Sequence, residues 1–189
     1  MSQAFLPNDD KLPVTQGNYT KLQDGENNIR ILSSAIVGYE YWNTENKPVR
    51  SKLYPKETPD IKLDKDGKPS RVRHFWAFEV YNYDTKSIQV MEVTQKTIME
   101  GIKALVDNSK WGDPKQYDIS ITKTGEKLDT SYNVVPNPKE ELSEEVKNLQ
   151  INTEINLEAL YTGADPFAQS GAVSGIESDV INADDIPFN

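Results

Sequence analysis

The chain has no cysteine among its 189 residues and a single histidine, His74. Without cysteine, disulfides, thiolate-bound zinc, iron–sulfur clusters and thiol nucleophiles are excluded. With one histidine, sites built from several histidine ligands are excluded as well, including the His-Glu-x-x-His zinc motif. The sequence therefore predicts no metal site and no cofactor.

Long apolar stretches are also missing. No window approaches the roughly 18 consecutive apolar residues that a transmembrane helix needs. The first residues contain neither the basic nor the apolar region of a signal peptide. Together with the lack of cysteine, these features predict a cytoplasmic protein without a membrane contact.

Positive charge is scarce and unevenly placed. The chain has 21 Lys and Arg against 30 Asp and Glu, a formal net charge of -9 that excludes a generic polybasic nucleic-acid binder. Residues 47–73, called the basic segment below, nevertheless contain nine basic and four acidic side chains. Such a segment is either a solvated loop or a local anion-binding surface.

The last residues, 163–189, contain five acidic side chains and no Lys or Arg. Their richness in Gly, Ala and Ser predicts a disordered acidic tail. The tail ends in an acidic tip with an apolar anchor, formed by Asp184, Asp185, Ile186, Pro187 and Phe188. Such a tip suits docking in a basic-rimmed hydrophobic pocket of a partner protein.

Hydrophobic periodicity predicts five strands and one helix. Alternation indicates strands at 28–42, 71–83, 87–93, 117–123 and 130–135, and apolar residues at helical spacing indicate a helix at 94–108. Five strands with a helix between the third and fourth is the order of a five-stranded oligonucleotide/oligosaccharide-binding (OB) barrel, here with a long basic loop insertion. An α+β sandwich with the same order remains an alternative.

This pattern divides the chain into four parts. They are an irregular N-terminal arm (1–16), an OB-like domain (17–137), an acidic extension with helical spacing (138–162) and the acidic interaction tail (163–189).

Single-stranded nucleic acid offers phosphates and base faces, and its binders combine cations with aromatic rings. The residue types around the basic segment fit both. The candidate phosphate contacts are Arg30, Lys47, Arg50, Lys52, Arg71 and Arg73. The candidate base-stacking residues are Tyr39, Tyr41, Trp42, Phe75 and Tyr81.

Core packing is the competing role for every aromatic residue. Val72, His74, Trp76, Phe78 and Val80 share one face of a strand, so we assign that face, with His74, to the core. Tyr39 and Tyr41 fit core and surface equally well, and Trp42 is favoured as a functional residue because it ends a strand beside a polar loop.

Signals of catalysis are weak. No phosphate-binding glycine loop and no Ser–His pair is evident, and Asp64-x-Asp66 lacks the rest of a calcium loop. We therefore predict no enzyme activity. Two alternatives remain: a protein-interaction module without DNA affinity, and a metal-dependent nuclease whose carboxylates come from separate positions.

The tip 184–188 resembles the tail tip of bacterial single-stranded-DNA-binding proteins, although Asn189 follows Phe188 here. The body instead resembles phage-encoded single-stranded-DNA-binding proteins. The similar stretches are GENNIRIL (25–32), VGYEYW (37–42), KPVR (47–50), TKTGEKLDT (122–130) and YNVVP (132–136).

This resemblance implies an OB fold and sequence-nonspecific coating of single-stranded DNA. It also implies work in phage DNA replication, recombination and repair in the host cytoplasm, with partner proteins recruited by the acidic tail. Some relatives hold a structural zinc, which a chain with one histidine and no cysteine should lack.

Overall fold

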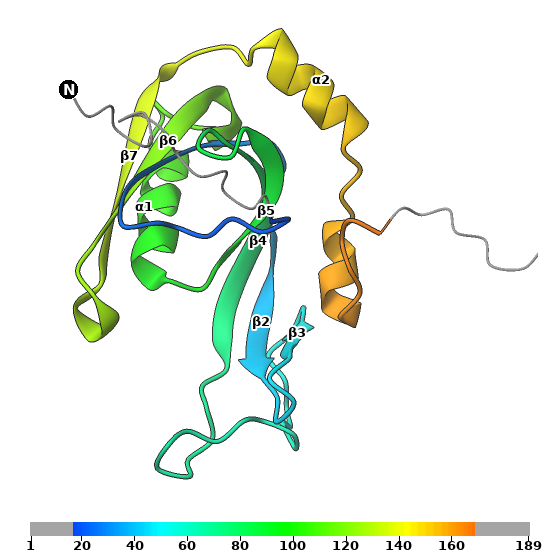
Figure 1. The fold of residues 1–189 in the computed structure, drawn as a ribbon. Coiled ribbons are helices and arrows are strands. Elements are labelled where there is room, and N and C mark those ends of the chain that lie inside the picture. Colours follow the sequence, from blue (N-terminus) through cyan, green and yellow to red (C-terminus); the bar gives the residue numbers. More distant parts are fainter. Residues whose placement is uncertain (1–16, 169–189) are drawn as a thin grey trace, which may run out of the picture.

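The computed structural model describes residues 17–168, and their strands form one antiparallel sheet (Figure 1). The seven strands are β1 (Gly25–Ile31), β2 (Ile36–Trp42), β3 (Pro48–Ser51), β4 (Arg73–Asn82), β5 (Ser87–Val93), β6 (Tyr117–Thr124) and β7 (Ser131–Lys139). The helices are α1 (Lys96–Asp107) and α2 (Glu144–Asn152), with short 3-10 turns η1 (Pro114–Gln116), η2 (Lys127–Asp129) and η3 (Leu157–Thr162).

The long strand β4 organises the sheet. One of its edges pairs with β2, through Gly38 opposite Phe75, and then with β1, through Arg30 opposite Tyr81. Its other edge pairs with β5. The single strand predicted at 28–42 is therefore two strands that follow the same edge, interrupted after β1, where the amide of Leu32 still donates to Glu79 O at 2.9 Å.

Across the sheet the strand order is β3-β2-β4-β1-β6-β7, with β5 paired to the other edge of β4. Helix α1 lies in the chain between β5 and β6, as predicted. This arrangement confirms a mainly β fold and is consistent with an OB-like one. The predicted five-stranded barrel is not confirmed, because the described residues form an open sheet of seven strands. The outer edge of β5 is occupied by a parallel segment instead: the amide of Thr20 donates to Val90 O, and that of Val90 to Asn18 O.

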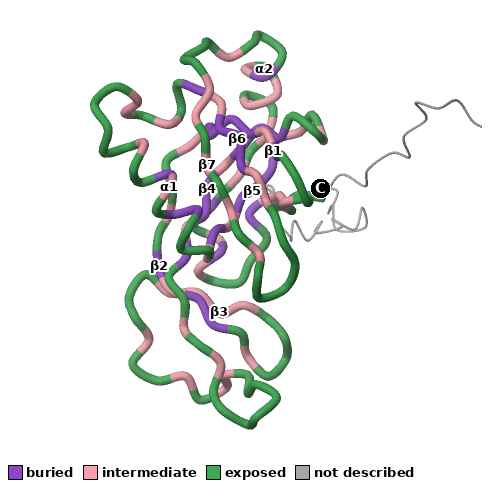
Figure 2. The backbone as a smooth tube through the Cα atoms, turned by 90° about the vertical axis from the view of Figure 1, so that its left-hand side faces the viewer, coloured by how far each residue is buried: buried purple, intermediate pink, exposed green. Residues whose placement is uncertain are grey.

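The main core lies between the sheet and α1. Ile98 and Ile102 of the helix pack against Ile29, Phe78 and Ile119 of the sheet, all of them buried. Figure 2 shows the buried residues gathered along the central strands, while the basic segment at the free end of β2 and β4 is largely exposed.

The opposite face of the sheet is covered by residues 142–167, called the strap below (Figure 1). Leu157 and Leu160 of η3 pack on Phe75, Ala77 and Val90. In α2, which begins within the stretch of predicted helical spacing, Val146 packs on Leu32, Tyr81 and Ile88. None of the helices in the described part of the chain has the length and apolar character to cross a bilayer.

Candidate nucleic-acid interface

Strand β2 exposes different side chains on its two faces. Since alternate residues of a strand point to opposite sides, Val37 and Tyr39 share one face, and Glu40 and Trp42 share the other. Tyr39 and Trp42, predicted to stack bases together, therefore belong to two separate surfaces.

The first surface is an array of four aromatic rings, called the Tyr39 cluster: Tyr39, Tyr54, His74 and Trp76. The ring of Tyr39 meets Tyr54 edge-on at 5.2 Å between centroids and His74 at 5.4 Å. His74 meets Trp76 at 6.5 Å. Edge-to-face packing holds such rings in fixed relative orientations. The array combines neighbouring strands β2 and β4 with Tyr54 from the basic segment.

The prediction that His74 is a core residue is wrong, because its side chain is exposed. Phe78 and Val80, further along the same face of β4, are buried as predicted, and Trp76 is half-buried against that core. The indole Nε1–H of Trp76 donates to His74 Nε2 at 3.0 Å. The core therefore ends at Trp76, and the face continues outward as a surface.

A hollow of about 500 Å³ adjoins this surface. Trp76 and Val37 form one wall, and Phe78 and Ile102 contribute apolar side chains. Val37 lies directly opposite Trp76 in the sheet and is 50% exposed. The exposed rings thus continue into an apolar depression with room for more than a solvent molecule.

The second surface is a larger cavity of about 1060 Å³ on the other face, called the Trp42 pocket. Trp42, 46% exposed, and Lys47 line it together with Tyr19 and the turn at 160–165. Arg50 and Glu92 also line it. The pocket gathers three residues of the predicted site: Trp42, Lys47 and Arg50.

Arg50 is already surrounded by carboxylates. Its Nε donates to Glu40 at 2.9 Å and its Nη2 to Glu92 at 2.8 Å, with the guanidinium 5.8 Å from the Phe75 ring centroid. Burial raises the pKa of Glu92, and the positive charge of Arg50 partly opposes this increase. Glu92 Oε1 has no hydrogen-bond partner in the described residues. The charge of Arg50 is thus balanced inside the protein, which contradicts its predicted role as a phosphate contact.

Arg30 is also a structural cation. It is 1% exposed, forms an ion pair with Asp118, and donates from Nη1 to Glu140 O at 3.1 Å. A phosphate does not reach a guanidinium in this position, so its predicted role is corrected.

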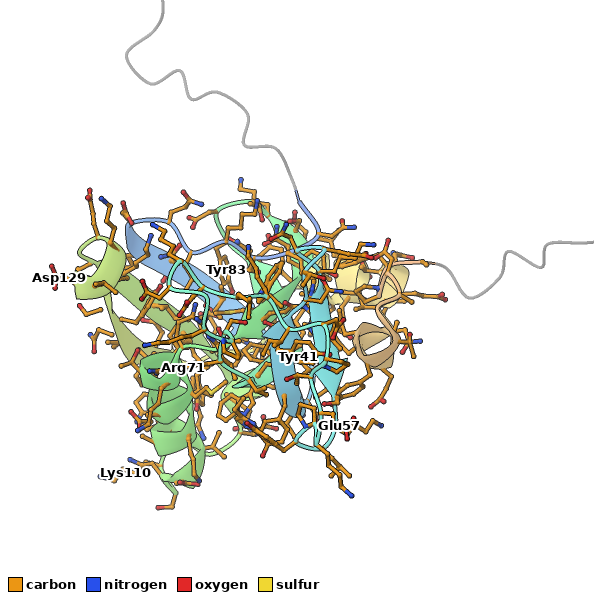
Figure 3. The ribbon with its side chains drawn as sticks, turned by 90° about the horizontal axis from the view of Figure 1, so that it is seen from below. Tyr41, Glu57, Arg71, Tyr83, Lys110 and Asp129 are labelled. Atoms are coloured by element: carbon orange, nitrogen blue, oxygen red, sulfur yellow. The ribbon has the colours of Figure 1, made fainter. Side chains whose placement is uncertain are left out.

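Three of the predicted stacking residues are buried. Phe75 is inaccessible and Tyr81 is 5% exposed, because the strap covers that face of β4. Tyr41 is 7% exposed, and its hydroxyl donates to Asp60 at 2.7 Å, which raises the pKa of Tyr41. Figure 3 shows Tyr41 at β2 and Glu57 in the outer part of the basic segment. These three rings support the fold and offer no face to a base.

The other predicted cations are exposed. Lys47 pairs with Glu45, and Lys52 pairs with Glu158 of the strap at 2.7 Å. Arg71 and Arg73 have no ion-pair partner within residues 17–168. The tip 184–188 lies outside the described residues. Across 17–168, no group of three or more acidic or histidine side chains is arranged to hold a metal ion.

The sequence interpretation missed Tyr54, His74 and Trp76 as surface residues. Tyr54 carried a signal, because it stands in a polar segment with prolines and lysines on either side. The position of His74 and Trp76 gave no such signal, because their strand alternates as a core strand does.

The chain is similar to a curated protein of Escherichia phage T5, the "Probable ssDNA-binding protein". The two are 30% identical over 141 residues, which covers 61% of this chain and 53% of the phage protein. The chain therefore spans about half the length of the relative that it matches. No protein-family model matches the chain. No solved structure matches it either.

Proposed function

We propose that this protein binds single-stranded DNA without sequence preference. The observation that carries the proposal is the Tyr39 cluster, which places aromatic rings on an exposed sheet face beside a segment with nine basic side chains. The similarity to a probable phage ssDNA-binding protein supports the same conclusion.

In the proposed complex, bases stack on the Tyr39 cluster. Each stacked base contributes about 1–3 kcal/mol, and every base has a π-face, so the readout tolerates any sequence. The hollow beside Trp76 receives a base that leaves the stack. The wall that Trp76 and Val37 form connects the two features, so a strand crossing the cluster reaches the hollow without a gap.

The exposed cations Lys47, Lys52, Arg71 and Arg73 contact phosphates. Lys47 lines the Trp42 pocket, Lys52 pairs with the strap and Arg73 faces the same side, so these three contact the part of the DNA strand that continues around the sheet to its other face. Each neutralised phosphate releases counterions, so the affinity falls linearly with salt on a log–log scale. Lys52 must exchange Glu158 for a phosphate, and Lys47 must exchange Glu45. Both pairs are solvent-exposed, and such pairs contribute little to stability, so a phosphate can replace the carboxylate.

The proposed biological role is the coating and protection of transient single strands during phage DNA replication, recombination and repair in the host cytoplasm. Residues 17–137 form the OB-like binding domain, and the extension at 138–162 supplies most of the strap on its other face. The first residues of the tail, as far as Phe167, belong to the strap as well. The acidic tail recruits partner proteins through its tip at 184–188.

The test is a titration of fluorescent dT oligonucleotides of graded length at several salt concentrations without magnesium, with duplex DNA as the control. We expect single-strand binding that weakens linearly on the log–log plot, with a slope that counts the phosphates contacted. An absence of binding at low salt overturns the proposal and favours a protein-docking module.

A further inference from the structure

We propose that His74 is a proton-dependent phosphate contact, so that the DNA-binding surface gains one positive charge as the pH falls. The inference rests on the proposed function, since it concerns the same surface. It adds His74 to the proposed DNA contacts and makes the affinity for DNA depend on pH.

The hydrogen bond between Trp76 and His74 defines the neutral state. Since the indole Nε1–H is a donor only, His74 Nε2 must be the acceptor and carry no proton. Protonation places a hydrogen on that nitrogen, so the imidazolium has two donors and no acceptor. The bond from Trp76 is then lost, and the imidazolium has two N–H donors without an acceptor among the described residues.

The surroundings of His74 leave the new charge available. The aromatic rings that contact His74 are Tyr39 of β2 and Trp76 of β4. Tyr54 of the basic segment contacts Tyr39 in turn. Its sequence neighbour Arg73 lies opposite Glu40, on the other face of the sheet. Within residues 17–168, no carboxylate forms an ion pair with His74. The imidazolium therefore has no internal partner, and a charged donor of this kind binds phosphate oxygens strongly.

The position also suits contact with DNA. His74 is exposed and lies between two rings of the Tyr39 cluster, so a strand whose bases stack on Tyr39 and Trp76 passes over it. Histidine side chains in general change their charge between about pH 5 and pH 8. His74 is the only histidine in the chain. A pH effect in that range therefore has one principal candidate at the proposed interface.

The test measures the salt dependence of dT binding by the full chain at about pH 8 and about pH 5.5. For single strands, each phosphate contact changes the log–log slope by about 0.7. We expect the wild-type slope to steepen by about 0.7 at the lower pH, and the affinity at low salt to rise with it.

Two variants separate charge from shape. His74→Gln keeps an oxygen that accepts the Trp76 indole N–H but stays neutral, so its slope should be the same at both pH values. His74→Arg is always charged and should give the steeper slope at both. Lys147→Gln removes a charge of α2, which packs on the other face of the sheet, and should retain the wild-type pH effect.

Nuclear magnetic resonance supplies a reading that needs no DNA. The chain has three tryptophans, and Trp76→Phe assigns the indole N–H signal of Trp76. That signal should shift between the two pH values in the wild type and stay in place in His74→Gln.

Several results would overturn the proposal while leaving DNA binding itself intact. One is a wild-type slope that does not depend on pH. Another is a pH effect that persists in His74→Gln, which would point to a carboxyl such as Glu92, whose pKa burial raises. A failure of all forms to bind dT would instead overturn the proposed function.

Discussion

The rings of Tyr39 and Tyr54 meet edge-on with their centroids 5.2 Å apart, although one belongs to β2 and the other to the basic segment. This contact fixes part of a long connection against a rigid sheet. Tyr54 is 62% exposed, so the contact leaves most of its ring free for a ligand.

Tyr54→Ala should weaken dT binding by about 1–3 kcal/mol, or roughly 5- to 150-fold, because one stacking ring is lost. The measurement is fluorescence anisotropy at fixed salt. Leu128→Ala is the matched control, since Leu128 is fully exposed at the tip between β6 and β7 and should have no effect. If Trp42→Ala reduced the affinity while Tyr54→Ala did not, the interface would lie at the Trp42 pocket.

Arg30→Met should destabilise the fold by about 3 kcal/mol, because it leaves Asp118 without its buried partner. The folded fraction should keep its DNA affinity, since Arg30 is inaccessible. Chemical denaturation and anisotropy measure the two effects. Lys103→Met breaks an exposed pair with Asp107 and should change stability by less than about 1 kcal/mol. A loss of DNA affinity without a loss of stability in Arg30→Met would restore its predicted role.

Leu160→Ala should reduce the free energy of unfolding by about 2–5 kcal/mol, since the side chain is buried against Phe75, Ala77 and Val90. Ile151→Ala, at a position of the strap that is 78% exposed, is the control and should leave stability unchanged. Equal stability of both variants would show that the strap is only loosely attached to the sheet.

Tyr83 should make the protein lose stability at alkaline pH. Burial and the hydrogen bond from its hydroxyl to Asp118 raise the pKa of Tyr83 from 10.0 to about 12. The folded state thus favours the protonated phenol. The resulting stability is fully present below pH 10.0 and is lost as the pH rises to about 12. Urea unfolding of Tyr83→Phe should show a flatter decline over this range than the wild type, and identical slopes would contradict the assignment.

Much of the fold follows from local patterns in the sequence. Alternation located every strand except β3, and the helical spacing of Ile98 and Ile102 located α1, because both periods reflect burial on one side. Local periodicity does not predict that 28–42 divides into two strands or that β3 pairs with β2. Both features depend on partners elsewhere in the chain.

The candidate site was harder to predict. Alternation correctly grouped Phe75 with Tyr81 and His74 with Phe78, but it does not tell where along a strand the core ends. Phe75 and Tyr81 are buried because the strap, more than 60 residues later in the chain, covers them. His74 is exposed because α1 covers the same face only further along β4. Arg30 looked like a free cation because Asp118, its partner, is 88 residues away.

The segment that occupies the outer edge of β5 has a consequence for how the chain folds. Its pairing joins Tyr19 to Val90, so it forms only after a loop of about 70 residues has closed, and closing long loops slows folding. Until then, β5 presents an open row of amides and carbonyls to other chains. Refolding should therefore be slower and less complete at high protein concentration, and N-terminal truncations that reach Thr20 should aggregate more readily than the full chain.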